Sequence, residues 1–298
     1  MPTHRRSILP YSIQNLLSQD TAKLVSNLAL EASSARIEVQ CLLQKILHVP
    51  RVYLLAHPER ELTDAEFAEY SALLQRRLQG EPVAYILGER EFFGLNFKVT
   101  PATLIPRPDT ELLVELAIQR IPQQEPCKVL DLGTGSGAIA LAIVQACPQA
   151  EVLACDASAA ALAVAQENAR TLGMGNVGFV LSDWFTALGR QRFALIVSNP
   201  PYIAANDPHL AQGDVRFEPV SALVSGSDGL DDIRHIISRA AAHLLPGGWL
   251  LLEHGYDQAA RVRNLLQQNG YAAVFSACDL AGTERVSGGR LDAPDGIL

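Results

Sequence analysis

Residues 128–146 read KVLDLGTGSGAIALAIVQA, and the fold class follows from this stretch. The first four residues, Lys128-Val129-Leu130-Asp131, are expected to form a buried strand. Three glycines follow within five residues, and an apolar helix is expected from Ala138 to Ala146. Glycines let the backbone of such a loop approach a ligand closely, and the first turn of the helix can face that ligand. The stretch therefore predicts a strand, a ligand-binding loop and a helix in succession.

Strands and helices alternate in regular order from this stretch onward. Further strands are expected at 151–156, 177–181, 193–197, 249–252, 271–277 and 284–286. The helices expected between them include one that ends at Arg170 and two that cover 231–244 and 258–268. Alternating buried strands and helices indicate a mostly parallel sheet with helices on both faces. The predicted fold class is α/β, with a Rossmann-like sheet of seven strands.

The N-terminal part of the chain has a different character. Residues 11–80 read as helices alone, because their apolar side chains recur at helical spacing. Thr63 and Glu66 form a capping box, which predicts the start of a helix just after Thr63. We expect an N-terminal helical recognition domain over 1–80, a β-hairpin linker over 81–108 and the α/β domain over 109–298.

The linker carries two recognisable elements. Residues 92–99 alternate around a glycine turn and predict a β-hairpin. Residues 105–109 read Ile-Pro-Arg-Pro-Asp and predict a rigid extended loop, because proline excludes the helical conformation from the residue before it. Asp109 is expected to cap the helix that begins at Thr110.

The composition is that of an ordinary soluble globular protein. Apolar residues make up 48% and charged residues 19% of the 298 residues, a balance that argues against wholesale disorder. The 24 basic and 32 acidic residues leave a net charge of −8, which disfavours direct binding to nucleic acid. There is no signal-peptide pattern and no run of about 18 apolar residues, so we expect no membrane association.

Cysteine and histidine usage gives no indication of a metal. The five cysteines and seven histidines form no CxxC, HxH or HExxH pattern. Structural zinc sites and disulfide frameworks need closer, paired spacing. We therefore expect no metal site, a reduced and cytoplasmic setting, and a monomer as the default state.

Acidic side chains follow the first strands, at the sheet edge where ligands of α/β proteins bind. Asp131 stands directly before the glycine loop Gly133-Thr134-Gly135-Ser136-Gly137. There it would repel a pyrophosphate but can pair with a cationic amino group, such as that of S-adenosylmethionine. Asp156 ends the second strand and can accept hydrogen bonds from both ribose hydroxyls. This pair of acids favours an adenosine-type ligand.

The residues after the third strand are candidates for contact with the adenine base. Asp183 can accept a proton from the adenine amine, and Trp184 either offers its ring face to the base or packs as a core aromatic. The spacing Gly135-x-Gly137-x-x-Ala140 also fits a dinucleotide fingerprint. An NAD-dependent dehydrogenase therefore stays open at this point.

The most specific motif is Asn199-Pro200-Pro201-Tyr202, which follows the fourth strand. The two prolines hold the backbone and donate no hydrogen bonds, so the Asn199 side chain and the Pro200 carbonyl present acceptors. Two acceptors match one planar NH₂ group, and Tyr202 offers a flat face on which that group can stack. The motif predicts a site for an amide or an exocyclic amine.

The combination of glycine loop and Asn-Pro-Pro-Tyr turn resembles the amino-group methyltransferases that use S-adenosylmethionine. The chain resembles in particular the release factor glutamine methyltransferase family, PrmC/HemK, from about residue 11 to Arg290. The segments that carry the resemblance are 80–86, 92–95, 105–111, 216–219, 228–230, 253–255 and 284–286.

The resemblance implies a function and a set of site residues. Members of that family methylate the side-chain amide nitrogen, N5, of the glutamine in the Gly-Gly-Gln motif of peptide chain release factors. By position, residues Gly133 to Gly137, Asp156, Trp184 and Asn199 would bind the cofactor. Residues Asn199 to Tyr202 would hold the glutamine, with Asn199, Pro200 and Tyr202 in the catalytic roles. No general base is expected, because the N-methylated amide loses its proton readily afterwards.

Two other interpretations remain open. An adenine-N6 methyltransferase of DNA or RNA suits the same turn, although the net charge of −8 counts against it. A non-catalytic adaptor would bind S-adenosylmethionine and use residues 1–80 to hold a partner. The dehydrogenase interpretation leaves the Asn-Pro-Pro-Tyr turn unexplained.

Overall fold

The computed structural model describes residues 11–292, which form two compact units. The first unit comprises the chain up to Gly88 together with Ala211–Phe217. The second comprises Glu89–Leu210 and the chain from Glu218 onward. Each unit has a hydrophobic core of its own, so each is described separately. Among the helices of residues 11–292, none is long and apolar enough to cross a membrane.

The first unit is helical, as its sequence pattern predicts. Its helices are α1 (Ile13–Leu28), α2 (Ala32–Leu47), α3 (Arg51–Ala56), α4 (Asp64–Leu78) and α5 (Val83–Leu87). The capping box that starts α4 is confirmed, since the Thr63 hydroxyl accepts from the Glu66 N–H and the Glu66 carboxylate accepts from the Thr63 N–H. Helix α3 lies within residues 11–80, which are predicted to be helical, although no separate helix is assigned to it. Helix α5 was not predicted, because five residues are too few to show helical periodicity.

The core of the helical unit contains a buried polar pair. Apolar side chains of α1, α2 and α4 pack together, among them Leu24, Leu43 and Leu74. Between them the Tyr70 hydroxyl donates to the Asp20 carboxylate at 2.8 Å, and both residues are almost fully buried. Burial and the neighbouring carboxylate raise the pKa of Tyr70, so this hydroxyl stays protonated.

The second unit is built on one sheet of seven strands, which confirms the predicted fold class. The strands are β3 (Cys127–Leu132), β4 (Ala150–Asp156), β5 (Val177–Leu181), β6 (Phe193–Ser198), β7 (Leu244–Glu253), β8 (Tyr271–Cys278) and β9 (Glu284–Leu291). Their order across the sheet is β5-β4-β3-β6-β7-β9-β8. The first five of these run parallel, and β9 is antiparallel to both of its neighbours.

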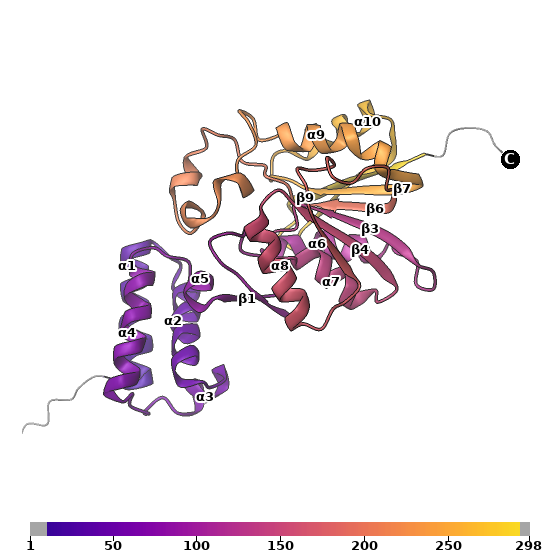
Figure 1. The fold of residues 1–298 in the computed structure, drawn as a ribbon. Helices are drawn as coiled ribbons and strands as arrows, with labels where there is room; N and C mark the ends of the chain where they lie inside the picture. The colour runs from indigo at the N-terminus through magenta and orange to yellow at the C-terminus, as the bar shows by residue number, and fades with distance from the viewer. Residues whose placement is uncertain (1–10, 293–298) are drawn as a thin grey trace, which may run out of the picture. The chain divides into compact units, whose positions relative to one another are not determined.

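Helices cover both faces of this sheet, as Figure 1 shows. The helices of the unit are α6 (Glu111–Ile118), α7 (Ala138–Ala146), α8 (Ala159–Thr171), α9 (Asp231–Ala240) and α10 (Ala259–Gln268). Helices α6 and α7 pack on one face with Val129 and Val197, and α9 and α10 pack on the other with Leu130 and Ile196. Neighbouring strand residues point to opposite faces, so the strands are apolar on both sides.

Short 3₁₀ helices lie in the connections. They are η1 (Pro108–Thr110), η2 (Pro208–Ala211), η3 (Val215–Phe217), η4 (Val220–Ala222) and η5 (Ala241–His243). The first of them corrects one expectation, since α6 begins at Glu111 with no side-chain cap. The Asp109 carboxylate instead forms an ion pair with Arg285 at 3.1 Å.

The predicted β-hairpin is confirmed and belongs to the sheet unit. Strands β1 (Glu89–Phe92) and β2 (Leu95–Lys98) pair antiparallel through a two-residue turn. Both turn residues, Phe93 and Gly94, have left-handed φ angles of 51° and 75°, the geometry that suits the twist of a tight hairpin. The buried rings of Phe92 and Phe97 join the core beneath α6 and α7.

Candidate active site

The central strands of the sheet end at one edge, where a cavity lies. In the parallel ladders Leu132 of β3 pairs with Cys155 of β4 and with Ser198 of β6, so the residues that follow these strands come together. The connections of β3 and β6 leave on opposite faces of the sheet, which makes this edge the usual ligand site of such folds. The cavity measures about 610 Å³.

Most of the predicted site residues line this cavity. They are Gly133, Thr134, Gly135, Ser136, Asp156, Asp183, Trp184, Asn199 and Pro201. Four others lie outside its wall, namely Asp131, Gly137, Pro200 and Tyr202. The structure therefore gathers residues from four separate strand ends at one place.

The glycine loop is held against the end of β4. The N–H groups of Gly133 and Thr134 both donate to the Cys155 carbonyl at 2.9 Å. Gly133, Gly135 and Gly137 all have left-handed φ angles, which side chains disfavour. A Cβ at Gly137 would lie 3.2 Å from the Ala165 Cβ, so this glycine serves the packing of α7 against α8.

Asp156 joins the loop to the cavity. One carboxylate oxygen accepts from the Gly135 N–H at 2.9 Å and the other accepts from the Ser158 N–H at 2.8 Å. A carboxylate has about four lone-pair positions, so both oxygens keep acceptor capacity toward the cavity. This arrangement fits the two vicinal hydroxyls of a ribose.

Asp131 lies buried against the loop and does not line the cavity. Its Oδ2 accepts from the Thr134 hydroxyl at 2.6 Å, and its Oδ1 has no partner within the described part of the chain. Burial raises the pKa of this carboxyl to about 7. A buried acid that is half satisfied favours a cation nearby, which is the charge that a methionyl amino group carries.

The Ser182-Asp183-Trp184 turn forms another part of the wall. The Ser182 hydroxyl donates to the Trp184 carbonyl at 2.8 Å, and Trp184 has a left-handed φ of 47°. Its ring packs over the loop, 3.7 Å from where a Cβ of Gly133 would stand. Trp184 lines the cavity and also packs against the apolar core, so the core alternative is confirmed, and its contact with the adenine base stays a prediction.

The Asn199–Tyr202 turn hydrogen-bonds to two side chains that were not among the predicted site residues. The Asn199 amide donates from Nδ2 to the Thr110 hydroxyl at 3.2 Å. The Tyr202 hydroxyl donates to Glu253 Oε1 at 3.3 Å. Because Nδ2 is engaged, the carbonyl oxygen of the Asn199 side chain is the atom left free to accept from a ligand.

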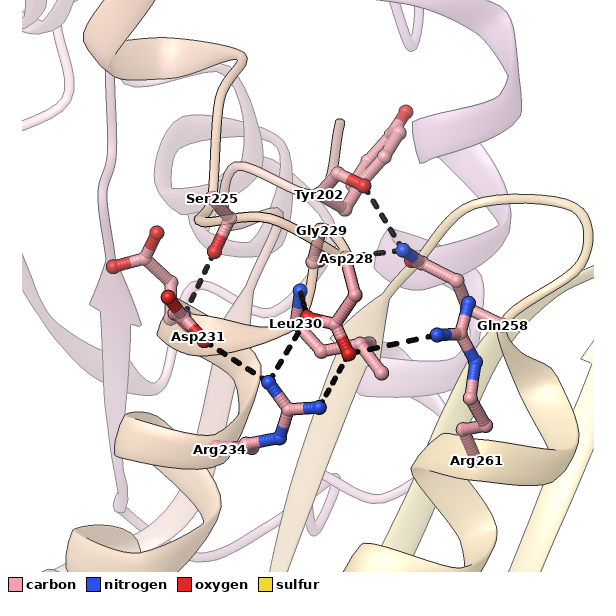
Figure 2. Close-up of polar contacts among 10 residues, drawn as sticks. Tyr202, Ser225, Asp228, Gly229, Leu230, Asp231, Arg234, Gln258 and Arg261 are labelled. Carbon is pink, nitrogen blue, oxygen red and sulfur yellow. Dashed lines mark hydrogen bonds and ion pairs between the residues drawn. The ribbon is translucent and has the colours of Figure 1, made fainter. Parts of the chain in front are cut away.

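Gln258 hydrogen-bonds to the same turn, as Figure 2 shows. Its Nε2 donates to the backbone carbonyls of Tyr202 and Gly229 at 2.9 and 3.3 Å, and its Oε1 accepts from the Gly255 N–H at 2.9 Å. Gln258 is 4% exposed, so these bonds form in a dry environment. Beside them Asp228 pairs with Arg234, which holds the Gly229 segment against the turn.

Two further groups near the turn have structural roles. Glu218 is buried, pairs with Arg107 and accepts from the Ile105 N–H at 3.0 Å. His254 is fully buried, with Nε2 bonded to the Ser287 hydroxyl at 2.8 Å and Nδ1 to the Gly255 carbonyl at 2.9 Å. Burial lowers the pKa of His254, so it is a satisfied interior histidine.

Two family models match the chain. The PrmC N-terminal domain matches residues 22–88, and the methyltransferase small domain matches residues 109–215. The release factor glutamine methyltransferase of Xylella fastidiosa is 52% identical over 86% of this chain and 93% of its own length. The chain belongs to the release factor glutamine methyltransferase family. The family member from Escherichia coli is 50% identical over 88% of this chain and 94% of its own length.

A solved methyltransferase structure is similar to this chain in fold. The catalytic domain of hMettl16, in complex with the MAT2A 3′UTR hairpin 6, superposes with a TM-score of 0.56 at 17% identity. The superposition covers 76% of this chain and 84% of that domain. At this identity the likeness extends to the architecture alone. The methyltransferase fold expected from the sequence is thereby confirmed.

Proposed function

We propose that this chain transfers a methyl group from S-adenosylmethionine to the side-chain amide nitrogen, N5, of the glutamine in the Gly-Gly-Gln motif of peptide chain release factors. Membership of the release factor glutamine methyltransferase family supports this function. The observation that carries it is the state of Asn199, which lines the cavity with its nitrogen engaged and its oxygen free. Such an acceptor selects an NH₂ group.

The cavity residues fit the methyl donor. Asp156 would accept from the ribose hydroxyls, Asp183 and Trp184 would contact the adenine, and the loop from Gly133 to Gly137 would follow the methionyl part. The unpartnered Asp131 oxygen would stabilise the positive charge of the amino group. When bound, S-adenosylmethionine supplies an electrophilic methyl group on a sulfonium.

The protein's own contribution to the transfer is orientation and electrostatics. A neutral amide nitrogen is a weak nucleophile, because its lone pair is delocalised into the carbonyl. The Asn199 side-chain oxygen and the Pro200 carbonyl would accept the two N–H bonds and favour positive charge at that nitrogen. Tyr202 would support the planar amide, and Pro201 would fix the turn. Holding the nitrogen in one orientation removes much of the entropic barrier.

We also propose a division of the chain into domains. We take residues 1–80 as the substrate-recognition domain, 81–108 as a linker and 109–298 as the methyltransferase domain. The match of residues 22–88 to the PrmC N-terminal domain supports the first assignment. The net charge of −8 supports a protein substrate and no direct nucleic-acid binding. We further propose that the chain acts in the cytoplasm as a monomer.

Mass spectrometry of a release factor tests the proposal. Purified release factor is incubated with the enzyme and isotope-labelled S-adenosylmethionine, and its Gly-Gly-Gln peptide is then sequenced. We expect the labelled methyl group on the glutamine, and none after replacement of that glutamine by alanine. Parallel reactions with plasmid DNA and total RNA test the adenine-N6 alternative. Label in nucleic acid and none in the release factor would overturn the proposal.

A further inference from the structure

Thr110 lies between two residues that are far apart in the sequence, Asn199 and Glu253. It is 4% exposed, lines the cavity and accepts from the Asn199 Nδ2 at 3.2 Å. Its hydroxyl also favours the ionised form of the Glu253 carboxyl, at the last residue of β7, by donating to it. The Glu253 Oε2 has no partner within the described residues. A chain of hydrogen bonds therefore runs from Glu253 through Thr110 to Asn199.

The chemistry of these groups determines which of them donates and which accepts in this series of hydrogen bonds. An ionised carboxylate only accepts, so the single proton of the Thr110 hydroxyl points to Glu253. The hydroxyl then presents a lone pair to Asn199, which can be satisfied only by the NH₂ end of the amide. The Asn199 oxygen is thereby turned to the opposite side. Without this direction the two ends of an asparagine amide are nearly equal in shape, and either can face the substrate.

We propose that Glu253, acting through Thr110, is the positioning residue that decides which end of the Asn199 amide faces the substrate glutamine. The inference rests on the proposed function and goes beyond it, since Glu253 is not among the residues that line the cavity. Its role is to keep the acceptor of Asn199, and not the donor, toward the substrate NH₂ group. A flipped Asn199 would oppose donor to donor.

The surroundings of Glu253 fit this role. The residue is 1% exposed, and its Oε1 also accepts from the Tyr202 hydroxyl, so one carboxyl serves both ends of the Asn199–Tyr202 turn. Burial raises the pKa of Glu253 to about 7, and the hydroxyls of Thr110 and Tyr202 oppose this rise by donating to the ionised form. The nearby Asp109 raises this pKa further and Arg285 lowers it.

Variants of Thr110 and Glu253 test the inference. Thr110→Val has the same shape but no hydroxyl, and Thr110→Ser restores it. We expect Thr110→Val to lower kcat about tenfold to a hundredfold, with the Kd for S-adenosylhomocysteine changed less than about twofold. Thr110→Ser is expected to recover kcat to within about threefold of wild type. Glu253→Gln keeps an acceptor for Thr110 and is expected to lose less kcat than Glu253→Leu. Glu151→Gln, an exposed change on β4, is the control.

Nuclear magnetic resonance can follow the Asn199 side-chain amide directly, without a measurement of turnover. In protein labelled with ¹⁵N-asparagine, the Asn199 side-chain NH₂ signal is assigned by its absence in Asn199→Ala. We expect faster solvent exchange of these protons in Thr110→Val and Glu253→Leu than in wild type and Glu151→Gln. Melting temperatures measured on the same samples separate loss of fold from loss of orientation.

The outcomes distinguish this inference from the proposed function. If wild type does not methylate the release factor, the proposed function fails. If wild type is active but Thr110→Val and Glu253→Leu keep kcat within about threefold, the positioning role is wrong. It is also wrong if Thr110→Val weakens S-adenosylhomocysteine binding as much as it lowers kcat, because Thr110 would then be a cofactor contact.

Discussion

The amide of Asn199 has one free end, and at the scale of single residues the proposed chemistry of the site depends on this free end. Its nitrogen is engaged by Thr110, 89 positions earlier in the chain, and its oxygen has no partner within residues 11–292. A fixed acceptor is already aligned before a substrate arrives, so no reorganisation is required when charge develops on the substrate nitrogen.

Replacing the Asn199 acceptor should affect turnover much more than cofactor binding. We expect Asn199→Ala to lower kcat about a hundredfold to a thousandfold, which is typical for loss of one preorganised hydrogen-bonding group. Steady-state kinetics with a release factor, together with calorimetry of S-adenosylhomocysteine binding, measure the two effects. Asn206→Ala, an exposed asparagine later in the same loop, is the matched control. Turnover within a few fold of wild type in Asn199→Ala would remove Asn199 from the catalytic role.

The raised pKa of Glu253 predicts a pH dependence. Burial raises the pKa from 4.5 to about 7 in the folded protein, so the carboxyl binds a proton as pH falls through that value. A protonated Glu253 can donate to Thr110, which removes the preference for the acceptor end of Asn199. We expect kcat to fall below about pH 7 in wild type, and this limb of the pH profile to be weaker in Glu253→Gln. An identical limb in both proteins would contradict the assignment.

The same ionisation predicts how stability changes with pH. Because the folded pKa lies above the unfolded value of 4.5, the folded state holds this proton more tightly, and Glu253 favours folding most at low pH. Its contribution to the free energy of unfolding is lost as pH rises from about 4.5 to about 7. Urea unfolding at pH 5 and pH 8 should show a smaller difference in Glu253→Gln than in wild type. The variant comparison removes the contribution of Asp131, whose pKa is also raised to about 7.

At the scale of elements, the turn after β6 is held by the segments that follow it. The Ile203 N–H donates to the Leu223 carbonyl at 2.8 Å, and the Ser225 N–H donates back to the Ile203 carbonyl at 2.9 Å. Gln258, just before α10, then bonds to Tyr202 and Gly229 together. The turn is therefore fixed by contacts with two later segments as well as by its prolines. Because Gly229 lies so close to the Tyr202 carbonyl, a side chain at position 229 is expected to disturb the turn.

Gly229→Ala should displace the turn. A Cβ at Gly229 would stand 2.3 Å from the Tyr202 carbonyl oxygen, at a left-handed φ of 75°. Gly247 has a similar φ of 80°, and no atom of the described residues lies within 4 Å of where its Cβ would stand, so Gly247→Ala is the matched control. Both changes incur about 1–2 kcal/mol of backbone strain, and Gly229→Ala adds about 1–3 kcal/mol from the close contact.

We expect the additional loss in Gly229→Ala to appear in kcat as well as in the free energy of unfolding. Denaturant titrations measure the second quantity, and single-turnover kinetics measure the first. Equal losses of stability in the two alanine variants, with normal turnover in both, would show that the contact of Gly229 with Tyr202 does not support the site.

At the scale of the whole molecule, two units with separate cores predict separate unfolding transitions. Within residues 11–292, the core of the helical unit contains no side chain of the sheet unit, and every residue that lines the cavity belongs to the sheet unit. A ligand stabilises only the state that binds it, so S-adenosylhomocysteine at about 100 times its Kd should stabilise the sheet unit by about 2.7 kcal/mol.

Scanning calorimetry measures this effect. We expect two transitions, of which one rises in temperature with ligand and the other does not. Asp156→Ala should remove the shift, because its carboxylate would no longer accept from the ribose. A single transition that shifts as a whole would show that the units unfold as one.

The sequence by itself determined most of the helices and strands, and it identified the strand ends that carry the candidate site residues. Local patterns carry this information, since the glycine loop, the two prolines after Asn199 and the alternation of apolar runs act within a few residues. The family resemblance from the same residues anticipated the methyltransferase fold and the family that the comparisons show. The short helix α5 was missed because its periodicity is too brief to detect.

Only the tertiary structure decided which side chains stand behind the site. Thr110 meets Asn199 across 89 positions, and Glu253 meets Tyr202 across 51. Such pairings depend on strand order and loop paths, and a single residue such as Glu253 has no local feature that marks its partners. The predicted helix cap by Asp109 was wrong for the same reason, because Asp109 forms an ion pair with the distant Arg285. Local sequence specifies which groups a segment can offer, whereas the packing of distant segments selects the ones that meet.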